Sequence, residues 1–158
     1  MELIFIFKFV HLIGASVLFG TSLGIAFFML MAHRTGHAGV IAVTARFVVI
    51  ADFVFTATSV VVQPLSGFAL ATAIGLSPFE EPWIVYSLVL YVLIGLCWLP
   101  VIFIQIRMRN LAQDAAVNAK PLPDEYRRLF RIWFWLGWPA FIGVIGIFYL
   151  MIWQPRPY

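Results

Sequence analysis

The chain has 158 residues, of which 63% are hydrophobic and 11% are charged, and its mean hydropathy is +1.01. A soluble domain of this length needs a larger charged surface, so the composition excludes one and predicts an integral membrane protein. In such a protein a net charge of +3 reflects the placement of cations beside membrane helices, and we expect no nucleic-acid partner. The single cysteine, Cys97, is interpreted as a small buried hydrophobic residue.

Four apolar stretches are each long enough to cross a bilayer, which takes about 20 residues in a helix. They predict helices over about residues 3–31, 45–74, 83–107 and 126–153, within a single transmembrane domain that covers residues 1–158. The predicted fold class is therefore all-α, an integral membrane four-helix bundle. The first stretch lacks the basic start of a signal peptide, so we expect it to remain as a spanning helix.

Positive charges predict the orientation of this bundle. The basic residues beside the first and third connectors are Arg34, Arg46, Arg107, Arg109, Lys120, Arg127, Arg128 and Arg131. Only Lys8 and Arg156 fall toward the other side. Because short loops rich in Lys and Arg stay cytoplasmic, we predict that connectors one and three are inside and that both termini are outside, N-out/C-out. A bacterial inner (cytoplasmic) membrane fits this multi-pass arrangement.

His11 is a titratable group inside the first predicted helix, where such groups are costly and therefore candidates for function. It lies about 12 Å from the outer end of that helix, at 1.5 Å per residue. A neutral imidazole is a common ligand for haem iron and other transition metals. Two interpretations stay open: His11 binds a metal or handles a proton, or it is hydrogen-bonded to a neighbouring helix.

The second predicted helix contains further polar positions. Counted along antiparallel helices, Gln63 and Ser66 fall near the depth of His11. Gln63 also follows Asp52 at a spacing that returns to almost the same helix face, so a polar seam is expected from Asp52 through Gln63 toward His11. The alternative is that these groups satisfy the backbone that Pro64 leaves unpaired.

Asp52 needs an opposite charge, a set of donors or a proton to be tolerated in a membrane helix. Its candidate partners are Arg46, a basic residue of another helix, or the hydroxyls of Thr21 and Ser22. We favour a structural ion pair in a polar network with Arg46 over a proton relay. Arg46 itself is interpreted as an anchor that extends to the cytoplasmic surface.

Small and aromatic residues offer surfaces for close packing. Gly20 and Gly24 form a GxxxG motif, which lets another helix or a flat cofactor approach. Trp133, Trp135 and Trp138 gather at the start of the last helix, where they serve as interface and packing residues or as the wall of a pocket for a planar ligand.

The first connector contains His33 and His37, spaced four residues apart. Because Gly36 interrupts a helix between them, we interpret both as solvated loop residues and not as a metal-binding pair.

Motifs in the first and second predicted helices resemble those of a known family of membrane proteins. The run Lys8–Ala15, followed by Phe19–Gly20, resembles the first helix of an uncharacterised bacterial family of small four-helix membrane proteins, a domain of unknown function. Arg46, Asp52 and the run Gln63–Gly67 resemble the second helix of that family, and the similarity covers nearly the whole chain.

The first helix is more distantly similar to the start of the bacterial membrane protoporphyrinogen oxidase family and of the copper-resistance membrane proteins. Both place a histidine early in a first helix, followed by small residues. The oxidase resemblance implies that His11 holds haem, although the lysine which that family uses in a later helix is missing from residues 83–107. The copper proteins use methionines and histidines outside the membrane, and here only Met1 lies near that end.

The leading hypothesis from the sequence is a b-type haem-binding or redox-linked inner-membrane protein with His11 as axial and metal ligand and with Gln63 and Ser66 beside the cofactor. Because there is one intramembrane histidine, the iron would be five-coordinate, use a different second ligand, or lie between two chains of a homodimer. The alternative is a non-catalytic membrane subunit or small transporter scaffold in which His11, Asp52 and Gln63 form a structural network. Enzymatic activity and a redox partner stay open.

Overall fold

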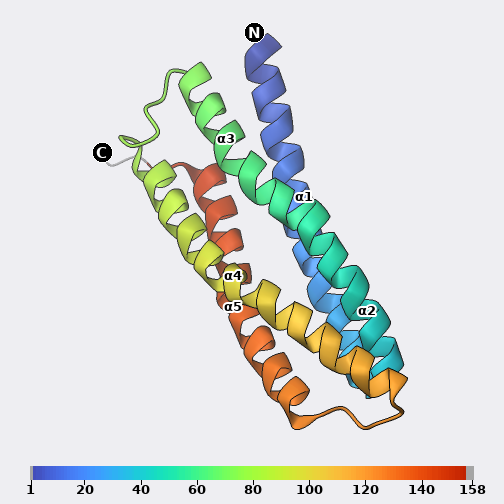
Figure 1. Ribbon diagram of the computed structural model, residues 1–158. Coiled ribbons are helices and arrows are strands. Elements are labelled where there is room, and N and C mark those ends of the chain that lie inside the picture. Colours follow the sequence, from blue (N-terminus) through green and yellow to red (C-terminus); the bar gives the residue numbers. More distant parts are fainter. Residues whose placement is uncertain (1, 156–158) are drawn as a thin grey trace.

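The computed structural model describes residues 2–155 as helices joined by short connectors (Figure 1). The elements in chain order are α1 (Glu2–Thr35), α2 (Ala38–Ala51), the π-helical turn η1 (Asp52–Thr56), α3 (Ala57–Ala73), α4 (Pro82–Val117) and α5 (Asp124–Trp153). Since η1 joins α2 to α3 without a break, residues 38–73 form one long helix. The described residues contain no strand, and the all-α prediction is confirmed.

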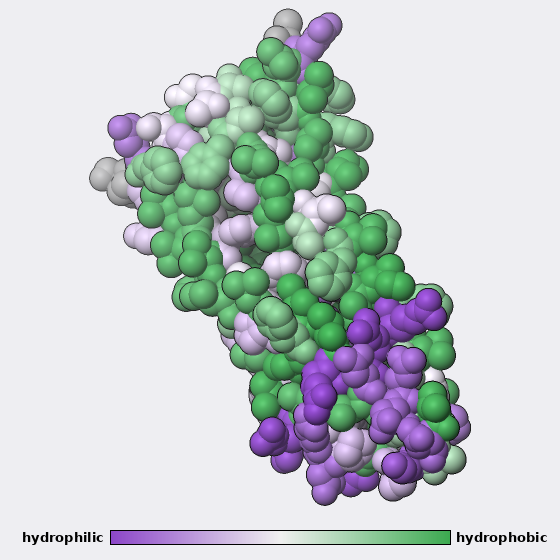
Figure 2. Space-filling view, viewed as in Figure 1, coloured by the Kyte–Doolittle hydropathy of each residue, from purple (hydrophilic) through white to green (hydrophobic). Residues whose placement is uncertain are grey.

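Four helices are long and apolar enough to cross a membrane: α1, the continuous helix 38–73, α4 and α5. In each of these helices, at most 28% of an 18-residue apolar segment is buried inside the protein. Apolar side chains therefore face outward along most of the length of these helices. Figure 2 shows this apolar surface, with hydrophilic residues gathered at the end that carries the α1–α2 and α4–α5 connectors. Such a surface is stable in contact with lipid, and the prediction of an integral membrane protein is confirmed.

The helices extend past several predicted bounds. The connector between α1 and α2 shrinks to residues 36–37, because Ile41 and Ala45 are buried in the core and packing continues the second helix back to Ala38. Gly36 adopts a φ of +66°, a left-handed conformation that glycine accommodates without strain. α4 likewise continues to Val117. Arg156 lies outside the described residues.

His33 corrects one interpretation from the sequence. It lies within α1 and is half-buried, and it is not a solvated loop residue. Its Nδ1 atom is 3.2 Å from the Tyr126 hydroxyl, and its ring stacks on Phe130 with 3.5 Å between the centroids. The reason is that α1 continues to Thr35, which carries His33 against the start of α5.

Two apolar clusters hold the helices together. The larger one lies toward the end with the short connectors and consists of Ile25, Met29, Ala32, Ile41, Ala45, Val48, Met108, Ala112, Tyr126, Phe130 and Trp133. The smaller one contains Ala71, Trp83 and Ile84, where α3 ends and α4 begins. In the sequence, the buried polar residues of η1 and α3 come after Val48 of the larger cluster and before Ala71 of the smaller one.

Helices α4 and α5 pack closely at Gly143, where an added Cβ atom would be 2.8 Å from Ile94 Cγ1. We expect Gly143→Ala to lower the free energy of unfolding by about 1–3 kcal/mol, the usual effect of overpacking a core contact. Thermal unfolding in detergent, followed by circular dichroism, measures the change. Gly137 in the same helix has no heavy atom within 4 Å of such a Cβ, so Gly137→Ala is the matched control. Equal effects of the two variants would contradict this packing.

Candidate functional site

His11 of α1 meets Ser66 of α3. The Nδ1 atom of His11 is 3.1 Å from Ser66 Oγ. The Ser66 hydroxyl donates its own proton to the backbone carbonyl of Val62 at 2.7 Å, so its oxygen is left to accept from the imidazole. This network assigns the tautomer with the proton on Nδ1, and Nε2 then carries a free lone pair.

Gly67 lets the imidazole of His11 approach the α3 backbone. A Cβ atom added to Gly67 would lie 3.0 Å from His11 Cε1 and 3.5 Å from its Nδ1. On the opposite helix, a Cβ added to Gly14 would lie 2.9 Å from the side-chain amide of Gln63. One glycine on each helix therefore makes room for the polar side chain of the other helix.

Gln63 hydrogen-bonds the backbone of α1 next to His11. The oxygen and nitrogen of an amide are told apart by their partners. In the orientation that satisfies both, Nε2 donates to the His11 carbonyl at 2.9 Å and Oε1 accepts from the Ala15 N–H at 3.1 Å. The structure thus brings together His11, Gln63 and Ser66, which counting along the helices placed at one depth.

Tyr91 of α4 satisfies the carbonyl that Pro64 leaves free. Proline has no N–H, so the Val60 carbonyl, four residues earlier, loses its usual helical partner. The Tyr91 hydroxyl donates to this oxygen. The groups that the sequence suggested for this task, Asp52, Gln63 and His11, did not include Tyr91. The available signal was a phenolic hydroxyl within an apolar helix, where it needs a partner.

Replacing Tyr91 with phenylalanine should lower the free energy of unfolding by about 1 kcal/mol, because the Val60 carbonyl then has no donor. The measurement is thermal or denaturant unfolding of the purified protein in detergent. Tyr86 on the same helix is exposed, so Tyr86→Phe is the control and should change stability little. If both variants unfold like the wild type, the hydroxyl contributes nothing to holding α3 on α4.

Asp52 forms a second buried polar cluster with residues of α4 and α5. It is 4% exposed, and its Oδ1 atom accepts from Trp98 Nε1 at 3.2 Å. In the satisfied amide orientation, Gln105 Nε2 donates to Asp52 Oδ2 at 2.8 Å, and Gln105 Oε1 accepts from Trp133 Nε1 at 3.1 Å. The carboxyl group therefore connects three spanning helices through neutral donors.

The expected ion pair of Asp52 with Arg46 or another basic residue is wrong. Among residues 2–155 the ion pairs are Arg107–Glu125 and Arg127–Asp124. Arg46 is exposed. Six residues at about 100° per residue place it on a different face of the helix from Asp52, so the two side chains do not meet. Ser22 donates to its own helix at the Leu18 carbonyl, so it is no partner either. A proton-handling role for Asp52 stays a prediction.

The expected polar seam from Asp52 to Gln63 is also absent. No hydrogen bond joins the two clusters in the part of the chain that the structure describes. The physical reason is η1, which begins at Asp52. A π-turn holds one residue more than an α-turn, so it rotates the side chains that follow by about 100°. The side chains of Asp52 and Gln63 consequently contact different neighbouring helices.

The fold and the two clusters can now be compared with known proteins. Residues 5–155 match the profile of a family described as a predicted integral membrane protein, DUF2269. The chain belongs to this family. Four apolar helices fit a four-helix membrane domain, and the function of the family is unknown. The resemblance to an uncharacterised bacterial four-helix family is thereby confirmed.

No curated protein and no solved structure matches this DUF2269 chain. The more distant resemblance to the membrane protoporphyrinogen oxidases and copper-resistance proteins therefore stays a prediction.

The described residues of this DUF2269 protein bring no three His, Cys, Asp or Glu side chains close enough to hold a metal ion between them. A haem makes a smaller demand, because the porphyrin supplies four nitrogen ligands and the protein only the axial ones. With the proton assigned to Nδ1, Nε2 of His11 is a nitrogen of the kind that haem iron takes from proteins.

Two features considered for a planar ligand are arranged differently in the DUF2269 structure. The indoles form no common wall: Trp133 is buried against Gln105, whereas Trp135 and Trp138 are 69% and 49% exposed. Gly20 and Gly24 have no heavy atom within 4 Å of an added Cβ, so no helix among the described residues packs on this motif. This face of α1 is open.

Proposed function

We propose that this protein is a redox-linked membrane protein that holds a b-type haem through Nε2 of His11. The observation that supports the proposal is the hydrogen bond from His11 Nδ1 to Ser66 Oγ at 3.1 Å. Histidines that ligate metals usually donate their other ring N–H to a fixed acceptor, which sets the tautomer and the orientation of the ring. Haem, when bound, would supply one-electron chemistry.

The neighbouring residues act on the imidazole and its helix. Ser66 orients the ring of His11 and keeps the proton on Nδ1. Gly67 allows the ring to lie close to α3, and Gln63 fixes the backbone of α1 through the His11 carbonyl and the Ala15 amide. Ser66, Gly67 and Gln63 are thus positioning residues in this proposal.

A homodimer is the proposed source of a second axial ligand. The other histidine of α1, His33, lies at the opposite end of that helix and bonds Tyr126, so a two-fold axis that brings a second copy of His11 is the proposed route to a second imidazole.

The distribution of charge supports a bacterial inner-membrane location with the connectors 36–37 and 118–123 in the cytoplasm. The arginines of the described residues lie nearer to these connectors than to the other ends of their spanning helices, whereas Lys8 lies toward the other end of α1. Cations are retained on the cytoplasmic side during insertion. In this orientation His11 lies in the half of the membrane nearer the periplasm.

Absorption spectra of protein purified from cells supplied with a haem precursor test the haem proposal. We expect a Soret band and, after reduction with dithionite, a sharp α band. His11→Ala should lack both bands, whereas His37→Ala, which changes an exposed histidine of the first connector, should keep them. Wild-type protein that is colourless, and stays so after titration with haem, would contradict the proposal.

A second candidate function, a non-catalytic membrane subunit or transporter scaffold, is favoured by the way the polar groups satisfy one another. Gln63 bonds the backbone of α1, and Asp52 has donors from Trp98 and Gln105. In that case His11→Ala would weaken the contact between α1 and α3 and lower the thermal stability without the loss of any chromophore.

A further inference from the structure

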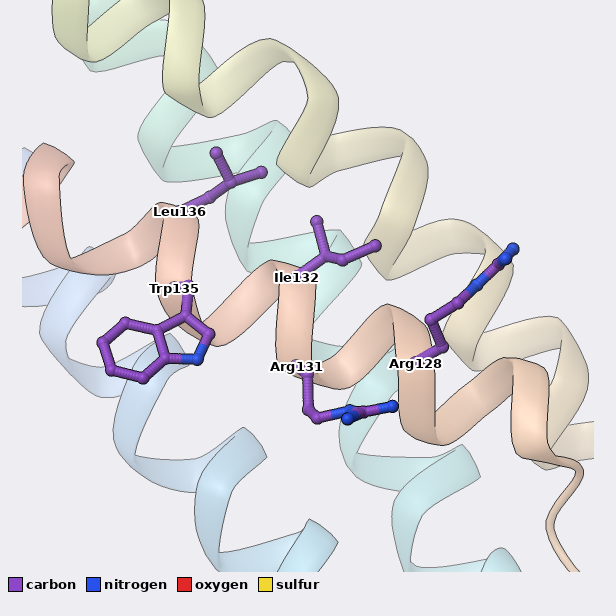
Figure 3. Close-up of a pocket in the computed structure, with 5 residues that line it drawn as sticks. All are labelled: Arg128, Arg131, Ile132, Trp135 and Leu136. Atoms are coloured by element: carbon purple, nitrogen blue, oxygen red, sulfur yellow. The ribbon is translucent and has the colours of Figure 1, made fainter.

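The start of α5 carries a shallow hollow of about 490 Å³. Its lining residues are Arg128, Arg131, Ile132, Trp135 and Leu136. In the view of Figure 3, Arg128, Ile132 and Leu136 project to one side of α5 and Arg131 and Trp135 to the other. At about 100° per residue, these two rows are adjacent on the surface of the helix. The hollow is therefore a groove between two adjacent rows of side chains on one helix.

The two guanidinium groups of this groove are available to an anion. Neither Arg128 nor Arg131 takes part in an ion pair within residues 2–155, and both are exposed. The nearest carboxylates in sequence are already paired, Asp124 with Arg127 and Glu125 with Arg107. Arg128 is near enough to Glu125 for their charges to interact, but neither arginine of the groove is held in an ion pair within the described residues.

The groove changes from charged to apolar along the helix axis. Ile132 and Leu136 lie about 6 and 12 Å beyond Arg128, at 1.5 Å per residue, in the direction of the membrane interior. Trp135 adds an exposed indole of the kind that sits at the level of lipid headgroups. An occupant must match this order: an anionic group beside the arginines and a hydrocarbon chain beside the aliphatic residues.

We propose that this groove binds an anionic phospholipid, with its phosphodiester between Arg128 and Arg131 and its acyl chain along Ile132 and Leu136. The bidentate fork of arginine suits phosphate oxygens, and basic pockets at the membrane surface of helical proteins favour anionic headgroups. The site is on α5 and uses no residue of the His11 cluster, so the proposal does not depend on haem binding.

Native mass spectrometry of detergent-purified protein titrated with phosphatidylglycerol or phosphatidylcholine tests this site. The wild type should prefer phosphatidylglycerol. The double variant Arg128→Gln/Arg131→Gln should bind that lipid about tenfold more weakly, with phosphatidylcholine unaffected. Arg34→Gln/Arg46→Gln removes two exposed arginines that do not line the groove and should keep the preference.

Three results would overturn the proposal: equal losses in the two double variants, equal binding of both lipids by the wild type, or release of phosphatidylglycerol by millimolar inorganic phosphate. The last result would identify free phosphate as the ligand. Arg131→Gln alone, with its helix content checked by circular dichroism, should give an intermediate loss if the double variant does not fold. His11→Ala should leave the lipid preference unchanged, which keeps this test separate from the haem test.

Discussion

Replacing Gln105 with leucine should lower the free energy of unfolding by about 3 kcal/mol, because the change leaves a buried carboxyl group without one of its donors. Gln105 is 3% exposed and bonds both Asp52 Oδ2 and Trp133 Nε1. Leucine fills a similar volume but offers neither a donor nor an acceptor. Denaturant unfolding in detergent, monitored through tryptophan fluorescence, reports the change and also the altered surroundings of Trp133.

The control is Gln113→Leu, an exposed position on the same helix, which should leave stability nearly unchanged. The double variant Asp52→Leu/Gln105→Leu should lose less free energy of unfolding than the two single variants lose together, because removing both partners leaves no carboxyl group to satisfy. If the losses of stability in the two single variants add up to that of the double variant, Gln105 does not donate to Asp52.

Removing the hydroxyl of Ser66 should weaken haem binding about 10- to 100-fold, the usual effect of losing the group that orients a ligating histidine. In Ser66→Ala the imidazole of His11 loses the acceptor of its Nδ1 proton, so both its tautomer and its orientation are no longer fixed. Titration of the purified protein with haem, followed at the Soret band, measures the affinity. Ser66→Thr keeps the hydroxyl and should restore binding.

Ser59→Ala removes another buried serine of α3 and serves as the control, since a general weakening of that helix would affect both variants alike. The reduction potential adds a readout that a purely structural role does not move, because Ser66 tunes the basicity of the imidazole. Wild-type affinity and potential in Ser66→Ala would mean that the hydrogen bond to His11 has no part in holding a cofactor.

Hydrophobicity alone was enough to predict the spanning helices. Long apolar stretches leave a membrane helix as the stable outcome, and all four predicted spans are present. Counting residues from opposite ends of two antiparallel helices also placed Gln63 and Ser66 beside His11 correctly, because straight helices rise by a constant amount per residue.

Counting residues along the helices could not predict the partners of Asp52. Its partners Trp98 and Gln105 are about a third of the chain length away from Asp52 in the sequence, and no local pattern indicates which face of α4 meets η1. The π-turn at Asp52–Thr56 breaks the 3.6-residue period on which the expected seam depended. Tyr91 was missed for a related reason, since the carbonyl it serves belongs to a different helix.

Imidazole rescue of a cavity variant tests most directly whether Nε2 of His11 binds haem. His11→Gly is purified without haem and titrated with haem, first alone and then with added imidazole. We predict the spectrum of unbound haem in the first titration and a Soret band like that of the wild type in the second, because free imidazole replaces the missing side chain. A His11→Gly protein that binds haem equally well without imidazole would contradict the claim.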